Sequence, residues 1–235
     1  MKAADGFRRA RHPEQIAARR AAILETATAM LAEMPVAEVS LNELSRRIGL
    51  AKSNVLRYFE SREAILLQVL DDAWQDWLGR MEQSLAEVDS PAPVTERIDQ
   101  VVERVVAELI SSPLLCELIS VAFSVLERNV ATETITRFKY RMLDATTVAA
   151  ARVRQCLPEL TEGSATGFAA EVFVLTTAVW PLTHPPARVA DALQDPNLAF
   201  ARLDFGETMR HLLITLLFGY LARPADDPPI KATGN

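Results

Sequence analysis

The segment Ile48–Phe59, IGLAKSNVLRYF, decides how this sequence is interpreted. A helical pattern runs into a lone glycine, Gly49, and a short polar segment then leads into the aromatic pair Tyr58 and Phe59. Glycine suits the left-handed backbone conformation in which many helices end. Because helices this short are not stable on their own, we expect them to pack on a longer helix and to serve a purpose outside their own fold.

Helical signals surround this segment. Ser40-Leu-Asn-Glu43 is a capping box, in which a Ser hydroxyl and a Glu carboxylate satisfy backbone N–H groups reciprocally. An apolar stripe with spacing i, i+3, i+7 follows at Leu41, Leu44 and Ile48. Val55 and Phe59 point the next short helix back at that stripe. Two short helices joined by a glycine turn and packed on a longer first helix describe a helix-turn-helix.

The outward face of the second short helix is polar. With Val55 and Phe59 turned inward, the residues that face away are Lys52, Ser53, Asn54, Arg57 and Tyr58. A major groove about 12 Å wide admits one α-helix. Lys and Tyr reach phosphates, Asn pairs with adenine edges, and Arg pairs with guanine. The pattern therefore predicts a DNA-reading helix.

Charge is distributed unevenly along the chain, whose net charge is −6. Residues 1–62 hold 11 Lys or Arg and 7 Asp or Glu, a balance of +4, and residues 63–235 hold 14 and 24, a balance of −10. A basic N-terminal region favours a polyanionic partner, although chance asymmetry would look the same. The basic residues before and at the start of the first helix form either an arm for the DNA backbone or minor groove, or a solubilising tail: Lys2, Arg8, Arg9, Arg11, Arg19 and Arg20.

The rest of the chain follows the helical period, and no segment shows the alternation of a strand, so we expect an all-α fold. The expected helices cover about 16–34, 61–86, 94–110, 114–126, 132–156, 168–182, 187–193 and 205–220. We expect an N-terminal arm and helix-turn-helix domain at 1–60, a larger helical domain for effector binding and dimerisation at 61–222, and a disordered tail at 223–235.

Several protein classes are disfavoured by composition and motifs. The N-terminus lacks the apolar core of a signal peptide, and no stretch approaches the roughly 18–20 uninterrupted apolar residues of a membrane span, so we expect a cytoplasmic protein without membrane contact. Cys116 and Cys156 are isolated, which suggests neither a disulfide framework nor a metal site. The three histidines lie in no catalytic motif and no nucleotide-binding glycine pattern occurs, so we expect neither an enzyme nor a cofactor.

The sequence resembles the tetracycline-repressor-like (TetR) family of transcriptional regulators over about residues 15–75. The resemblance rests on RRAAILETATAMLAEM and VSLNELSRRIGLAKSNVLRYFESREAILLQVL, which contain the glycine turn, the short helix ending in an aromatic residue and the Ser-Arg-Glu that opens the next helix. It implies that DNA contacts fall on Lys52, Ser53, Asn54, Arg57 and Tyr58, with phosphate contacts at Asn42 and Arg62. Leu56 departs from the family, which usually has Tyr there.

The resemblance also implies a homodimer that binds a palindromic duplex operator and releases it when a small effector binds. Dimerisation would use about 166–179 and 205–220, which are otherwise central helices of a monomer. Each expected residue of the effector cavity, for an apolar or aromatic ligand, has ordinary core packing as its alternative: Trp74, Trp77, Met81, Cys116, Phe123, Tyr140 and Trp180. The competing class of protein is a helical interaction module that does not bind DNA.

Overall fold

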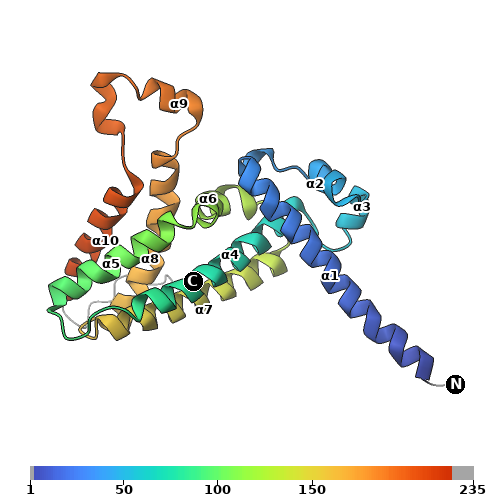
Figure 1. The fold of residues 1–235 in the computed structure, drawn as a ribbon, viewed down its shortest axis with the longest axis horizontal. Helices are drawn as coiled ribbons and strands as arrows, with labels where there is room; N and C mark the ends of the chain where they lie inside the picture. The colour runs from blue at the N-terminus through green and yellow to red at the C-terminus, as the bar shows by residue number, and fades with distance from the viewer. Residues whose placement is uncertain (1–2, 224–235) are drawn as a thin grey trace. The chain divides into compact units, whose positions relative to one another are not determined.

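The computed structural model describes the backbone of residues 3–223 and the side chains of residues 13–223, and it contains no strand within that range. The all-α fold predicted from the sequence is confirmed. The α-helices, labelled in Figure 1, are α1 (Ala3–Glu33), α2 (Leu41–Ile48), α3 (Lys52–Val55), α4 (Arg62–Leu85), α5 (Val94–Ile110), α6 (Pro113–Val121), α7 (Thr132–Cys156), α8 (Glu162–Thr183), α9 (Ala187–Ala192) and α10 (Phe205–Ala222). The 3-10 helices η1 (Val36–Glu38) and η3 (Pro196–Ala201) and a π-helical turn, η2 (Ala122–Leu126), complete the regular structure.

Most of the predicted helices lie where the sequence placed them. α1 is longer than expected, since its backbone is helical from Ala3, and α8 begins at Glu162 because Thr161 caps it and accepts a bond from the Ser164 N–H at 3.0 Å. The 3-10 helix η3 was not predicted. Lys2 and the tail from residue 224 lie outside the described residues, as do the side chains of Arg8, Arg9 and Arg11.

The chain divides into two compact units. The first unit comprises Met1–Asp72 with Ala122–Phe138, and the second comprises Ala73–Val121 with Lys139–Asn235. Both α4 and α7 therefore contribute residues to each unit. The functional division at residue 60 stays a prediction.

The first unit is built on α1. Ile23, Ala27 and Met30 are fully buried on one face of this helix, and Leu44 and Val55 bury the inward faces of α2 and α3. α1 contacts α2, and α2 contacts α3. The apolar stripe that the sequence predicts thus forms the core of this unit.

A side-chain cap fixes the start of α2. The Ser40 hydroxyl accepts a bond from the Glu43 N–H at 3.1 Å, as the capping box predicts. The Glu43 carboxylate turns away from the cap and accepts from Arg46 at 2.6 and 2.8 Å and from Arg47 at 3.0 Å. Hydrogen bonds from Arg46, then Arg47, lower the pKa of Glu43 to about 2. The carboxylate half of the predicted capping box is therefore replaced by ion pairs.

Gly49 ends α2 in the left-handed conformation, with φ 70° and ψ 30°. Its N–H donates to the Arg46 carbonyl at 3.2 Å, and the Leu50 N–H donates to the Ser45 carbonyl at 3.0 Å. Among the described residues no other φ is positive. The turn predicted at Gly49 is confirmed, and it sets the direction in which α3 leaves α2.

The second unit packs α10 against α5 and α8, and α6 against α8. Its core includes Phe168 from α8 and Met209, Leu213 and Leu217 from α10. By length and composition alone α8 would reach across a membrane, and so would α5 and α6 together despite an 84° bend between them. In α8, 44% of the apolar window is buried inside the protein, a property that core helices share.

Two glycine substitutions test the turn. Gly49→Ala is expected to lower the free energy of unfolding by about 1–2 kcal/mol, because a Cβ disfavours the left-handed conformation. Gly79→Ala is the matched control: it lies in the interior of α4, where an added Cβ also meets nothing within 4 Å. It is expected to raise the free energy by roughly 0.5–1 kcal/mol. Denaturant unfolding followed by circular dichroism measures the stability of both variants. A Gly49→Ala protein as stable as the parent would show that the left-handed conformation does not require glycine.

Candidate functional site

The turn presents a polar face on α3 and the residues after it. Helical hydrogen bonds continue beyond α3, since the Leu56 N–H donates to the Lys52 carbonyl at 3.0 Å and the Phe59 N–H to the Val55 carbonyl at 3.2 Å. Val55 and Phe59 are buried at 0% and 5% exposure. The predicted contact residues Asn42, Lys52, Ser53, Asn54 and Arg57 are exposed, and Tyr58 is half-buried. We call Lys52, Ser53, Asn54, Arg57 and Tyr58 the reading face. Leu56, 40% exposed, lies on the same segment.

Arg20 of α1 holds the end of this segment in place. Its guanidinium donates to the Tyr58 carbonyl oxygen and lies over the Phe59 ring, with Cζ 4.0 Å from the ring centroid. The sequence grouped Arg20 with the basic arm, but the structure gives it an internal role. A cation over an aromatic face together with a charged hydrogen bond stabilises the orientation of the reading face.

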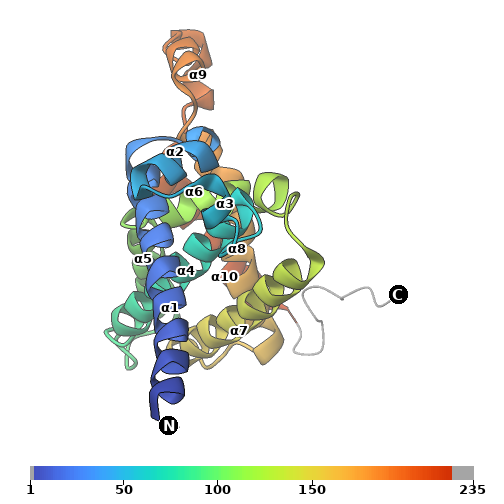
Figure 2. The ribbon, with the colours of Figure 1, turned by 90° about the vertical axis from the view of Figure 1, so that its right-hand side faces the viewer.

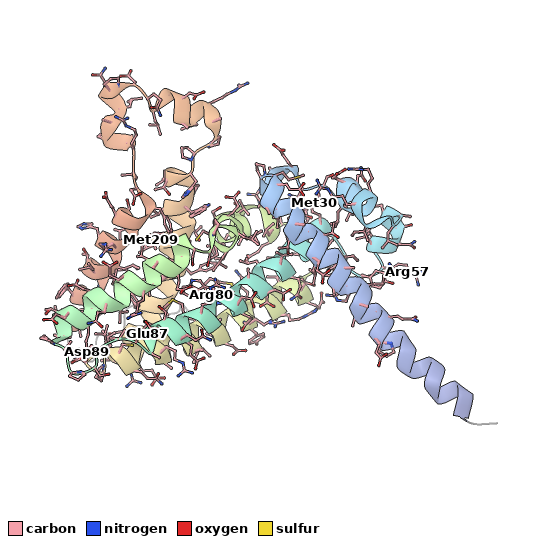
Figure 3. All side chains as sticks on the ribbon, in the orientation of Figure 1. Met30, Arg57, Arg80, Glu87, Asp89 and Met209 are labelled. Atoms are coloured by element: carbon pink, nitrogen blue, oxygen red, sulfur yellow. The ribbon has the colours of Figure 1, made fainter. Side chains whose placement is uncertain are left out.

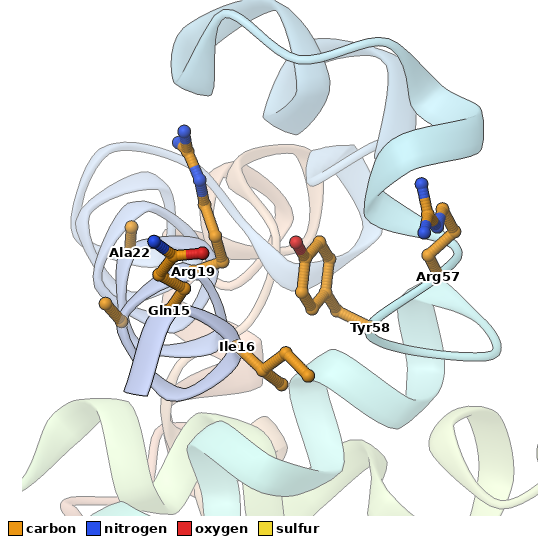
Figure 4. A pocket seen from close by; sticks show the side chains of 7 residues that line it. Gln15, Ile16, Arg19, Ala22, Arg57 and Tyr58 are labelled. Carbon is orange, nitrogen blue, oxygen red and sulfur yellow. The ribbon is translucent and has the colours of Figure 1, made fainter. Parts of the chain in front are cut away.

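A hollow of about 640 Å³ separates α1 from the reading face. It is lined by Gln15, Ile16 and Arg19 of α1 and by Arg57 and Tyr58, with Ala18 and Ala22 completing the wall. Figure 4 shows the Tyr58 ring between the side chains of α1 and Arg57. Two exposed guanidinium groups, those of Arg19 and Arg57, thus border one cavity. The sequence indicated Arg19 through its charge but gave no signal for Gln15.

The Arg62 guanidinium makes hydrogen bonds within the protein. Its Nε donates to the Val39 carbonyl and its Nη2 to the Val36 carbonyl, while Nη1 pairs with Glu63 at 3.1 Å. The side chain is only 20% exposed. These bonds tie the start of α4 to the link between α1 and α2. Arg62 therefore supports the helix-turn-helix from within, and its predicted phosphate contact stays a prediction.

The second unit holds a small apolar cavity of about 30 Å³ between α4, α5, α7 and α8. Trp74, Trp77 and Met81, three of the residues expected in an effector cavity, line this space. Lining residues that the sequence did not single out include Leu85, Val105, Thr146, Arg152, Phe168 and Val172. The apolar residues among them have the same helical spacing as core residues that line no cavity. Spacing alone therefore could not select them.

Four other expected cavity residues do not line this space. Cys116 is fully buried, and its thiol donates to the Leu109 carbonyl at 3.5 Å; burial raises its pKa to about 12. Trp180 is buried elsewhere, and its indole N–H donates to Glu117 at 3.1 Å. Phe123 belongs to the first unit at 45% exposure, and Tyr140 is 65% exposed on α7. Aromatic side chains at helical spacing do not reveal which face a neighbouring helix covers.

The two tryptophans of the cavity carry an unusual feature. The indole nitrogens of Trp74 and Trp77 are buried and have no hydrogen-bond partner, and their rings lie 5.6 Å apart. Buried polar groups nearly always have a partner, so each such donor requires an explanation.

No cluster of three His, Cys, Asp or Glu side chains that would hold a metal ion occurs within the described residues.

Comparison with known proteins agrees with this geometry. Residues 23–69 match the family profile described as "Bacterial regulatory proteins, tetR family", and residues 71–224 match "Tetracyclin repressor-like, C-terminal domain". EthR, an HTH-type transcriptional regulator of Mycobacterium tuberculosis, is 40% identical over 53 residues, which are 23% of this chain and 24% of EthR. This match therefore spans about a quarter of that relative's length.

Solved structures share the fold. A TetR/AcrR-family regulator from Thermobifida fusca is 20% identical, with a TM-score of 0.51 over 86% of this chain and 98% of its own. A TetR regulator from Rhodococcus sp. RHA1 is 18% identical, with a TM-score of 0.51 over 87% and 97%. These structures show that the fold of this chain is one that solved TetR-type regulators have. The chain belongs to the TetR family of bacterial regulatory proteins.

Replacing Arg62 tests its supporting role. Arg62→Ala is expected to lower the free energy of unfolding by about 1.5–3 kcal/mol, because hydrogen bonds from a charged group to two carbonyls are lost. Arg46→Ala, at a side chain 73% exposed, is the control and should leave unfolding little changed. Urea unfolding measures both variants. Unchanged stability combined with weakened DNA binding would show that Arg62 acts as a phosphate contact and not as a support.

Proposed function

We propose that this chain is a cytoplasmic homodimeric repressor that reads a palindromic operator with the reading face and releases it when an apolar effector enters the second unit. The observation that carries the DNA-binding part is the reading face itself: exposed side chains with nucleic-acid chemistry stand on a short helix whose opposite side is buried. Asn54 suits an adenine edge and Arg57 a guanine, while Lys52 and Ser53 suit phosphates. Asn42, exposed at the start of α2, adds a phosphate donor.

The hollow beside the reading face supports a path for one DNA strand. Arg19 and Arg57 border it with their guanidinium groups, and Gln15 and Tyr58 add neutral donors. Phosphate contacts of this kind fix the register of a protein on duplex DNA without reading its sequence. Leu56, which has no hydroxyl for a phosphate, offers apolar surface to a thymine methyl group.

Dimerisation through α8 and α10 would double the number of bases read. Both helices bury one face in the second unit and still expose apolar residues, with Val174 and Leu182 at 58% and Phe218 at 44%. A helix that is apolar on more than one face fits a second partner. Two-fold symmetry would place the two reading faces about 34–36 Å apart, one turn of DNA.

A salt titration with an arginine variant tests the DNA-binding part. Binding of the parent protein to duplex DNA is expected to weaken by about 10³–10⁵ between 50 and 200 mM salt if it contacts 6–10 phosphates. At a selected site, Arg57→Ala should cost about 1–3 kcal/mol and relax the base preference there. Arg154→Ala, an equal charge change at an exposed position of α7, is the control.

The rival function predicts a different outcome of the same titration. A helical interaction module would show no binding to duplex DNA even at low salt. An Arg57→Ala protein with the parent's affinity and footprint would show that Arg57 reads nothing.

The cavity supports an effector with a particular chemistry. At about 30 Å³ it has room for little more than a water, whereas ligand sites of small molecules are typically 300–1,000 Å³. Binding must therefore open the space between α4, α5, α7 and α8, and a ligand that favours the open state shifts the population toward it. The unpartnered N–H groups of Trp74 and Trp77 favour an apolar ligand that carries a hydrogen-bond acceptor.

A pair of matched small molecules tests this chemistry. Acetophenone and ethylbenzene are similar in size, but only the ketone accepts a hydrogen bond. We expect the parent protein to bind acetophenone about tenfold more tightly, a difference of about 1.4 kcal/mol. Trp77→Phe keeps an aromatic ring and removes one donor, so the preference should shrink. Ligand-observed NMR measures both affinities, and equal binding of the two probes by the parent would rule out an acceptor.

A further inference from the structure

The segment between α8 and α10, which we call the connecting arm, comprises residues 185–204 with α9 and η3. In Figures 1 and 2 its helices lie away from the other helices of their unit. None of its residues is buried. Figure 3 shows the same segment, with its side chains, set apart from the other helices of its unit.

The connecting arm exposes several large apolar residues. Phe200 is 80% exposed, and Val189, Leu198 and Leu203 are 48%, 36% and 43% exposed. Single exposed apolar residues are ordinary on a protein surface, but an aromatic residue grouped with three aliphatic ones on one short segment is typical of a contact site. Aromatic residues are also the usual anchors of protein interfaces.

The arm is nevertheless built as an ordered element. At its base Trp180 stacks on His184 with centroids 3.7 Å apart, and Phe205 packs edge-on against Trp180 at 5.1 Å. Within the arm, the Asp195 carboxylate accepts from the Asn197 N–H at 2.9 Å, and Asp204 caps α10 by accepting from the Glu207 N–H at 2.8 Å. Ordering a chain segment costs conformational entropy, and no residue of the arm is buried within one copy to offset this cost. Burial of the arm's apolar residues against another surface would offset it.

A second copy of this chain fits that surface best. The arm joins the end of α8 to the start of α10, and both helices expose apolar residues, among them Leu182 and Phe218. The arm thus continues the dimer face proposed above, and the inference rests on that proposed dimer. Its two Arg and three Asp give a net charge of −1, which fits neither a nucleic acid nor an anionic membrane.

We propose that each connecting arm packs on the partner protomer, with Phe200 as its anchor. In a two-fold dimer the same patch is used by both subunits, so one contact type would bury both arms. The arms would then strengthen the dimer beyond what α8 and α10 provide.

Cross-linking tests the contact in the intact protein. A photoreactive benzophenone amino acid replaces Phe200 in unlabelled chains, which are mixed with isotope-labelled chains before irradiation. We expect cross-linked peptides that join labelled and unlabelled chains. The same group in place of Tyr140, which is 65% exposed on α7, is the control and should give far fewer. Cross-links only within one chain, or none, would overturn the proposal.

Sedimentation equilibrium separates the arm from the rest of the dimer. Phe200→Glu is expected to raise the dimer dissociation constant at least tenfold, whereas Tyr140→Glu should leave it unchanged; both positions are exposed within one copy, so both variants should fold. Leu216→Glu, at a half-buried position of α10, should split the dimer. If Leu216→Glu splits the dimer and Phe200→Glu does not weaken it, the arm proposal fails and the dimeric regulator stands. A parent protein that is monomeric at all concentrations would overturn both.

Discussion

The left-handed turn at Gly49 is the constraint on which the reading face depends. α2 and α3 span eight and four residues, too short to be stable alone. Their placement is therefore set by the turn and by the burial of Leu44, Val55 and Phe59. Because Val55 and Phe59 point inward, the polar side chains between them must point outward. Arg20 fixes the far end of the segment through the Tyr58 carbonyl and the Phe59 ring. A local backbone preference therefore becomes a surface suited to DNA.

The parts of the fold that obey local rules could be read from the sequence. The Ser40 cap, the Gly49 turn and the bounds of α5 and α7 follow from residues within one or two helical turns. Arg20 and Arg62 could not be assigned this way, because their partners lie 38 and 23 to 26 residues away in sequence. The charge of Arg20 suggested an arm for DNA, and the family resemblance implied a phosphate contact at Arg62. Only the tertiary structure reveals that both side chains bind backbone carbonyls.

The cavity illustrates a second limit of sequence reasoning. Helical spacing marks an apolar face but not the neighbour that covers it. Trp77 and Met81 line the small cavity, whereas Tyr140, with similar spacing, is exposed to solvent. The same limit applies to the proposed dimer face of α8 and α10 and to the connecting arm, for which we propose another copy of the chain as the partner. The helices of the first unit can be inferred from local sequence signals. The proposed ligand and dimer surfaces are inferred from the unpartnered indole N–H groups and the exposed apolar residues of the second unit.

Selection of bound sequences from random duplex DNA tests the central claim most directly, since it requires no knowledge of the operator. If two reading faces related by a two-fold axis insert into successive major grooves, the enriched sequences will be palindromes with half-sites one helical turn, about 10–10.5 base pairs, or a multiple of it apart. Enrichment of no motif, or of a single motif without two-fold symmetry, would contradict the account.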